Sequence, residues 1–260
     1  MPAPQLATAS ITDRIQALSS QESIRPFDIK AIERDIERLK AVSAAEAFML
    51  SGMLKALLGD YEASKEMHQK SLRLAMDEVG LVNYGISLRK LGRLIEAKVS
   101  FLKALARSPG SAAIFEKVIQ TSTFICDYED FESLVSNFVK ANPSCDLKDI
   151  ECMRNAETIV AHLASLEIPL AEYKLVGGFI EQAMLEFDLL SETINERLSS
   201  FDGSSHVYVE IPLPVKSAGQ LVAINDRIAE LVLSCDEISS WDKLVVNFID
   251  SRSAPNSAVA

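Results

Sequence analysis

The sequence predicts a mainly α-helical fold, a solenoid of helical hairpins followed by a small α+β domain of order α-β-β-α-β. Three observations predict it: a 33-residue internal repeat, a switch to two-residue alternation near the C-terminal end, and an acidic excess confined to the last part of the chain. The chain has 260 residues and 48% of them are hydrophobic, which suffices for one large domain or two ordinary ones.

The charge distribution changes along the chain. Residues 144–260 hold 19 acidic and eight basic side chains, whereas the two signs balance before them, so the net charge of −11 lies in the last part. A solvated acidic surface is the simpler explanation, and two differently built halves are the other. We expect a disordered N-terminus, a helical repeat domain, an α+β domain and a disordered tail at residues 1–10, 11–166, 167–250 and 251–260.

The repeat appears when residues 45–77 are aligned with residues 78–110. Small residues recur at a constant offset of 33, as Gly59 and Gly92 do. Apolar residues at helical spacing stand on both sides of this glycine, which indicates two helices joined by a turn. Such a pair cannot cover its apolar face alone, so units of this kind stack.

This pattern resembles the tetratricopeptide repeat family, whose unit of about 34 residues has a large residue, a glycine four later, a Gly-Asp-Tyr-like turn, small residues and a closing proline. The first unit matches at Phe48, Gly52, Gly59, Asp60, Tyr61, Ser64, His68 and Ser71, and the second at Leu81, Gly85, Leu88, Gly92, Ala97, Phe101, Ala104 and Pro109. A less regular third unit over residues 112–145 contains Phe115, Tyr128 and Pro143. The resemblance covers about residues 45–143 and implies stacked helical hairpins.

Helices are also expected on both sides of the repeats. Upstream, Ser10 is expected to cap one helix and a second follows Pro26, and this pair would cover the exposed end of the stack. Downstream, a helix over residues 147–166 is expected to cover the other end.

Strands are predicted after a further helix that starts at Pro169. Asp202-Gly203 is a signal for a two-residue hairpin turn, and residues 207–213 alternate between apolar and polar side chains. The remaining expected elements are a partner strand near residues 194–200, a helix capped by Ser217 and a last strand over residues 243–249. Because the outer strands of such a sheet leave backbone groups unpaired, the C-terminal domain is also predicted to form a homodimer or to accept a partner's strand.

The sequence shows no catalytic, cofactor-binding or metal-binding pattern. Its four cysteines form no CxxC pair and its three histidines lie far apart, so neither a zinc site nor a disulfide framework is expected. His68 stands at the aromatic position of its unit and is expected to pack in the core. We therefore expect no catalysis, no cofactor and no metal.

Composition also narrows the partners and the compartment. The net charge of −11 repels nucleic acid and anionic lipid, and no apolar stretch reaches the ~20 residues of a membrane span, so neither nucleic acid nor membrane is expected as a partner. The N-terminus lacks the pattern of a signal peptide, which predicts a cytoplasmic protein with reduced thiols.

The resemblance implies a peptide-binding groove on the concave side, lined by the first helix of each pair. Carried over residue by residue, the groove positions are Met49, Leu50, Met53, Leu57, Val82, Asn83, Ile86, Arg89, Lys90, Lys117, Gln120 and Phe124. The apolar first end suits a hydrophobic anchor, while Arg89 and Lys90 offer cations to an acidic group. The alternative is that Met49, Leu50 and Met53 pack against the preceding helical pair.

A scaffold or adaptor that binds a protein or peptide client is the favoured function. The five-residue clamp with which some members of the family hold a chaperone's carboxylate is not matched, because of its residues only Asn83 is identical and Lys117 merely keeps the charge. The alternatives are a dedicated chaperone that shields an apolar segment of one client and, less favoured, an enzyme with its site in the C-terminal domain.

Overall fold

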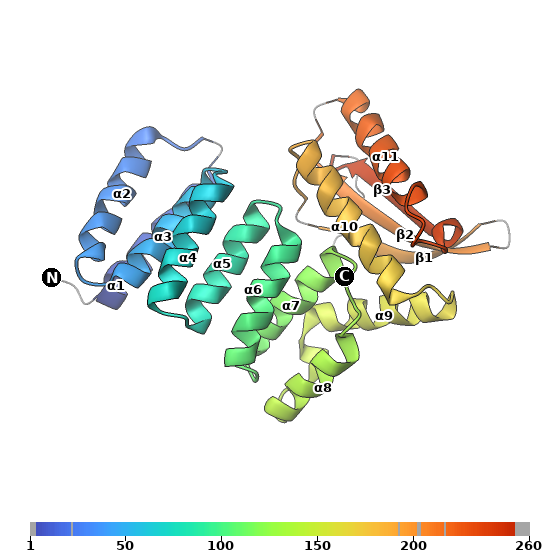
Figure 1. Cartoon of the computed structure of the whole chain (residues 1–260), viewed down its shortest axis with the longest axis horizontal. Helices are drawn as coiled ribbons and strands as arrows, with labels where there is room; N and C mark the ends of the chain where they lie inside the picture. Colours follow the sequence, from blue (N-terminus) through green and yellow to red (C-terminus); the bar gives the residue numbers. More distant parts are fainter. Residues whose placement is uncertain (1–3, 22, 192, 202–203, 216, 253–260) are drawn as a thin grey trace. The chain divides into compact units, whose positions relative to one another are not determined.

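The computed structural model describes residues 4–21, 23–191, 193–201, 204–215 and 217–252. It confirms the predicted fold class, because the chain is mainly helical and ends in a small three-stranded sheet (Figure 1). The chain divides into two compact units, Met1–Pro109 and Gly110–Ala260.

The first unit consists of helical pairs. Its helices are α1 (Pro4–Ser19), α2 (Pro26–Lys40), α3 (Ala44–Leu57), α4 (Tyr61–Leu74), α5 (Glu78–Lys90) and α6 (Leu94–Arg107). The two clear repeats correspond to α3 with α4 and α5 with α6, as the sequence predicts. The first helix begins at Pro4, so residues 4–10 of the expected disordered N-terminus are helical, and Ser10 lies inside a helix rather than at its start.

Glycines at two kinds of position explain why the repeat pattern folds in this way. Gly59 and Gly92 end α3 and α5 with φ angles of 76° and 71°, a conformation that other residues rarely adopt. Gly52 and Gly85 instead allow close packing: a Cβ atom there would lie 2.5 Å from the ring of His68 and 2.4 Å from the ring of Phe101, respectively. The small residues of the repeat therefore let the two helices of each pair approach each other.

The N-terminal pair covers the first repeat. Buried side chains of α1 and α2, including Ile15 and Ile36, form one core cluster with Met49, Leu50 and Leu54 of α3. This is the role that the sequence predicts for the pair.

The second unit joins helices to the sheet. Its elements are α7 (Ala112–Phe124), α8 (Phe131–Ala141), the 3₁₀ turn η1 (Leu147–Asp149), α9 (Glu151–Ser165), α10 (Leu170–Glu186), β1 (Asn195–Phe201), β2 (Ser204–Leu213), α11 (Ala218–Leu233), the 3₁₀ turn η2 (Trp241–Lys243) and β3 (Leu244–Asp250). The third predicted repeat corresponds to α7 and α8 and belongs to this unit. The rings of Phe115 and Phe138 stack between the two helices, but the helix that packs most closely against α7 is α9, so this repeat is not a tight helical pair like the first two. The helix expected over residues 147–166 is interrupted, because Ile150 has an extended backbone between η1 and α9.

The sheet has the order β1-β2-β3, with β1 antiparallel and β3 parallel to the central strand. The apolar residues of β2, Val207, Val209, Ile211 and Leu213, are buried, and α11 packs against β3 and α10. The predicted Asp202-Gly203 turn and residues 253–260 of the predicted tail lie outside the described residues. Strands β1 and β3 are the edges of the described sheet, and self-association through either edge stays a prediction.

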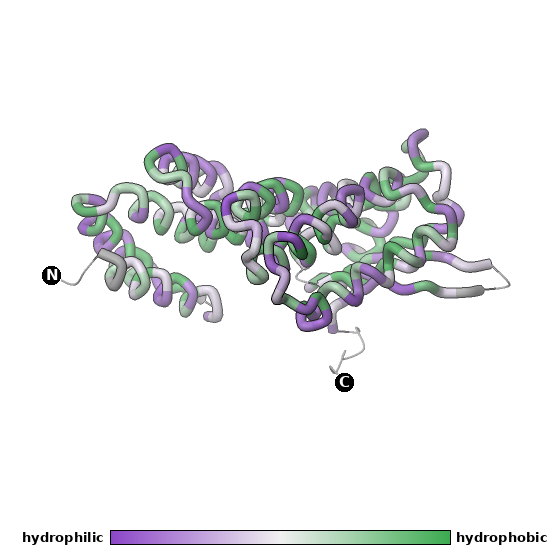
Figure 2. The backbone as a smooth tube through the Cα atoms, turned by 90° about the horizontal axis from the view of Figure 1, so that it is seen from below, coloured by the Kyte–Doolittle hydropathy of each residue, from purple (hydrophilic) through white to green (hydrophobic). Residues whose placement is uncertain are grey.

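Hydrophobic and hydrophilic residues follow one another in short stretches along the helices (Figure 2). Within the described part of the chain, no helix combines the length and the apolar character that crossing a membrane requires.

Candidate functional site

The apolar end of the expected groove lies mostly in the core. Met49 and Leu50 are buried, and Met53 and Leu57 pack against the same cluster that α1 and α2 form with α3. For these four positions the structure thus shows packing against the preceding helical pair.

The expected groove residues of α5 remain more accessible. Val82, Asn83, Ile86 and Arg89 are half-buried and Lys90 is exposed. The Asn83 amide donates to the Val79 carbonyl at 3.0 Å and also contacts the Met49 sulfur at 3.3 Å. Asn83 therefore links α5 to α3. Lys90 is the most accessible of the expected groove residues on α5.

The third group of expected groove residues lies on α7, in the second unit. Phe124 is buried, Lys117 is half-buried, and Gln120 is exposed and donates to Glu116 at 3.1 Å. Phe124 thus contributes to the core of its own unit rather than to a surface.

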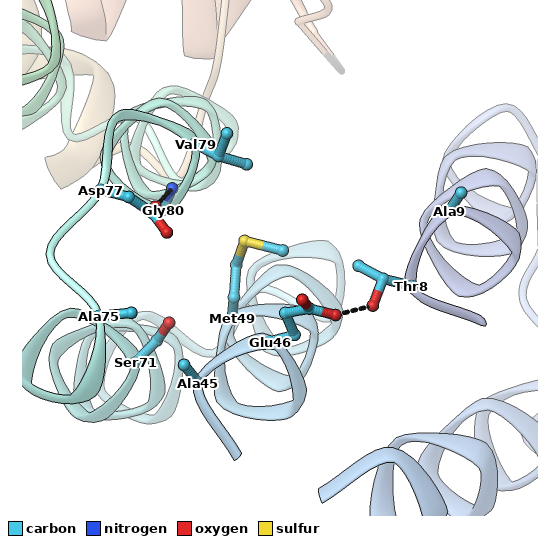
Figure 3. Close-up of a pocket in the computed structure, with 10 residues that line it drawn as sticks. All are labelled: Thr8, Ala9, Ala45, Glu46, Met49, Ser71, Ala75, Asp77, Val79 and Gly80. Carbon is cyan, nitrogen blue, oxygen red and sulfur yellow. Dashed lines mark hydrogen bonds between the residues drawn. The ribbon is translucent and has the colours of Figure 1, made fainter. Parts of the chain in front are cut away.

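A cavity of about 330 Å³ opens between α1, α3 and the start of α5 (Figure 3). Most of the residues that line it are small, and the full set is Thr8, Ala9, Ala45, Glu46, Met49, Ser71, Ala75, Asp77, Val79 and Gly80. Met49 points into it, Glu46 accepts a hydrogen bond from Thr8, and Asp77 caps α5 by accepting from the Gly80 N–H at 2.7 Å. The Glu46 carboxylate thus links α1 to α3 and the Asp77 carboxylate caps α5, and the remaining wall is chiefly apolar.

A larger groove of about 450 Å³, here called the outer groove, runs between α4 and α6, with α5 as its floor. Leu72, Leu81, Tyr84 and Leu88 line its base. Three large apolar side chains stand open to solvent at its walls: Met76, Ile95 and Val99 are 57%, 46% and 47% exposed. These exposed apolar side chains thus gather within one hollow and are not scattered singly over the surface.

The rim of this outer groove is cationic. Lys65, Arg73 and Lys103 line it together with one acid, Glu96. Lys65 is engaged, because its ammonium group contacts the Tyr61 hydroxyl at 2.6 Å and the Glu96 carboxylate at 3.2 Å, and these bonds raise its pKa. Among the described residues, Arg73 and Lys103 form no ion pair or hydrogen bond. The groove therefore has two cations without a counterion.

The repeat pattern alone does not point to the outer groove. The positions carried over from the family belong to the first helix of each pair, whereas Met76, Ile95 and Val99 lie on or beside the second helices. A scan of α6 for apolar residues on its solvent side would have found Ile95, Val99 and Leu102, which follow one another at helical spacing.

The described residues contain no group of three or more His, Cys, Asp or Glu side chains that could hold a metal ion. No protein-family model matches the chain, and no match to a curated protein was found.

Proposed function

We propose that the protein is a non-catalytic interaction scaffold of the tetratricopeptide type, and that its first unit binds a client segment combining apolar with acidic side chains. The observation that supports this proposal best is the outer groove, whose exposed Met76, Ile95 and Val99 lie beside the uncompensated charges of Arg73 and Lys103. The N-terminal helices pack against the apolar end of the groove that the resemblance implies, so the outer groove offers the more accessible apolar surface.

Both parts of the groove contribute to recognition. Removing the exposed apolar side chains from water drives association, and matching acids of the client set its orientation along the groove. The floor side chain of Tyr84 supplies a rigid aromatic surface, and burial raises the pKa of its hydroxyl to about 12, so the floor stays neutral at physiological pH. A client segment with apolar residues at helical spacing and Asp or Glu at its ends fits these features.

Selection from a random peptide display library against the intact chain tests the proposal. We expect the recovered peptides to combine apolar residues with Asp or Glu. In fluorescence anisotropy, the double variant Arg73→Glu, Lys103→Glu should bind them at least about tenfold more weakly, because it replaces attraction by repulsion at the rim. Val99→Asp should weaken binding to a similar degree by placing a charge in the apolar wall.

Lys90→Glu is the matched control, since it reverses an exposed charge of the groove that the resemblance implies and leaves the outer groove unchanged. Its affinity should equal that of the parent within about twofold. Peptides whose binding responds to Lys90→Glu and not to the rim variants would place recognition on the concave side. A library that yields no binding peptide would contradict the proposed function itself.

A further inference from the structure

The second unit contains a small polar cavity that the scaffold role does not use. It has a volume of about 200 Å³ and lies between α7, α9 and β1. Its polar wall includes Thr123, Asn155 and Glu196, and Ile159 and Ile194 supply an apolar part. The Thr123 hydroxyl oxygen is buried and has no hydrogen-bond partner among the described residues. The cavity wall thus contains an unpaired hydroxyl group beside a space large enough for a few non-hydrogen atoms.

Glu196 is the one acid among the described residues of the cavity wall, and the sheet holds it there. It stands opposite Val209 in the β1–β2 register, so its side chain shares the face of the sheet that carries the buried apolar residues of β2. Two tyrosines from distant parts of the chain bind its carboxylate: Tyr173 of α10 donates to one oxygen, and Tyr128 donates to the other at 3.2 Å. The two rings stack with their centroids 6.3 Å apart, which fixes both hydroxyls.

This carboxylate has no cationic partner among the described residues. Two cations on neighbouring elements are engaged elsewhere: Lys174 of α10 pairs with Glu129 at 2.6 Å and with Asp127 at 3.5 Å. Arg197 pairs with Glu210 at 3.8 Å and lies over the ring of Tyr208, on the opposite face of the sheet. Two hydrogen bonds orient the Glu196 carboxyl group, and no cation among the described residues pairs with it.

We propose that this cavity binds a small organic cation, a primary ammonium group on a short aliphatic chain, with Glu196 as its counterion. The ammonium group has three donors, which suit the carboxylate, the Thr123 hydroxyl oxygen and the Asn155 amide oxygen. Its carbons would lie against Ile159 and Ile194. The ammonium belongs either to a free amine or to a lysine side chain of a partner protein, since both present the same group.

The titration of the site supplies a second readout. Burial raises the pKa of Glu196 to about 7, although its two tyrosine partners oppose the shift. Tyr128, Tyr173 and the neighbouring Cys126 have pKa values raised well above their usual range by burial, so they stay neutral. A bound cation favours the ionised carboxylate and should therefore displace its proton.

Isothermal titration calorimetry with n-butylammonium on the full chain tests the proposal, with butanol and butyrate as neutral and anionic probes of similar size. We expect binding of the ammonium alone, about tenfold weaker at pH 6 than at pH 8, because the ionised fraction of a group with pKa about 7 falls by that factor. Proton release at pH 7, seen as a dependence on the buffer's ionisation enthalpy, should accompany binding. The peptide Ac-Gly-Lys-Gly-amide distinguishes a lysine side chain from a free amine.

Three variants make the result specific. Glu196→Gln keeps the size of the side chain and one acceptor oxygen, so one tyrosine hydroxyl must turn to accept from the new amide N–H, and it should abolish binding because the negative charge is gone. Glu157→Gln removes an exposed charge on α9 and should not change binding. Asn155 lies at the exposed edge of the cavity wall, so Asn155→Lys places an ammonium group beside the cavity and should compete with the probe. This variant tests the proposal even if Glu196→Gln fails to fold. Equal responses to butanol and butylammonium, no binding at all, or undiminished binding in Asn155→Lys and Glu196→Gln would overturn the proposal.

Discussion

Replacing Gly177 with alanine is expected to destabilise the second unit by about 3 kcal/mol or more, at the upper end of the usual cost of overpacking. A Cβ atom at this position of α10 would lie 1.7 Å from the carbonyl oxygen of Ile125 and 2.2 Å from its carbonyl carbon. Both are backbone atoms at the end of α7, so no side-chain rotation relieves the clash. Urea unfolding followed by the fluorescence of the single tryptophan, Trp241, measures the loss within this unit.

Gly178→Ala is the matched control, one residue along the same helix. No atom lies within 4 Å of the Cβ that it introduces, so the substitution adds helix propensity without a clash. We expect a stabilisation of up to about 1 kcal/mol. Equal losses in the two variants would show that α10 does not need the close approach to Ile125.

Acid is expected to destabilise the first unit through His68. This side chain is fully buried, its Nε2 lies 2.8 Å from the Ser87 hydroxyl, and its ring stacks on Tyr84. Burial lowers its pKa from 6.5 to about 3, so the unfolded chain binds this proton more readily than the folded one. The folded unit therefore keeps its full free energy of unfolding above about pH 6.5, and the part that depends on a neutral His68 is lost as the pH falls towards 3. At about 1.4 kcal/mol per pKa unit, the total is on the order of 5 kcal/mol.

Hydrogen exchange of peptides from α3 to α5, measured between pH 7 and pH 4 with correction for the intrinsic rate, reports this loss within the first unit. The double variant His68→Phe, Ser87→Ala is the control. The second repeat already places Phe101 above a glycine at the corresponding position, and alanine removes the hydroxyl that would lose its partner. The variant should flatten the pH dependence. An unchanged slope would mean that another group causes the acid sensitivity.

The sequence was most informative where local chemistry decides the structure. The pairs α3 with α4 and α5 with α6 follow from glycines that end helices or admit an aromatic ring, and both requirements are visible in a single chain at fixed spacing. Strand β2 follows from alternation and β1 from the turn signal at Asp202-Gly203, whereas β3 follows from a continuous run of apolar residues. The start of α1 at Pro4 was missed because the first residues carry neither a cap nor an apolar period.

The candidate sites depend on contacts that no local pattern records. Glu196 belongs to a polar stretch that looks like an exposed strand, and its partners Tyr128 and Tyr173 are 68 and 23 residues away. The cavity of Figure 3 requires Thr8, a residue assigned to a disordered end before the structure placed it against α3. The outer groove was missed because positions were carried over from one face of the repeats only.

The mixed sheet also has a consequence for the order of folding. Strands β1 and β2 are neighbours along the chain, so their pairing closes a very short loop and is expected to form within microseconds. Strand β3 pairs with β2 in parallel, Leu244 opposite Val207, and must wait until the intervening α11 has crossed over. Until β3 docks, the backbone N–H and C=O groups on this edge of β2 are unpaired. The strand also carries the apolar side chains of Val209 and Ile211. Misassembly between nascent copies would therefore begin at this edge, which the finished fold no longer exposes.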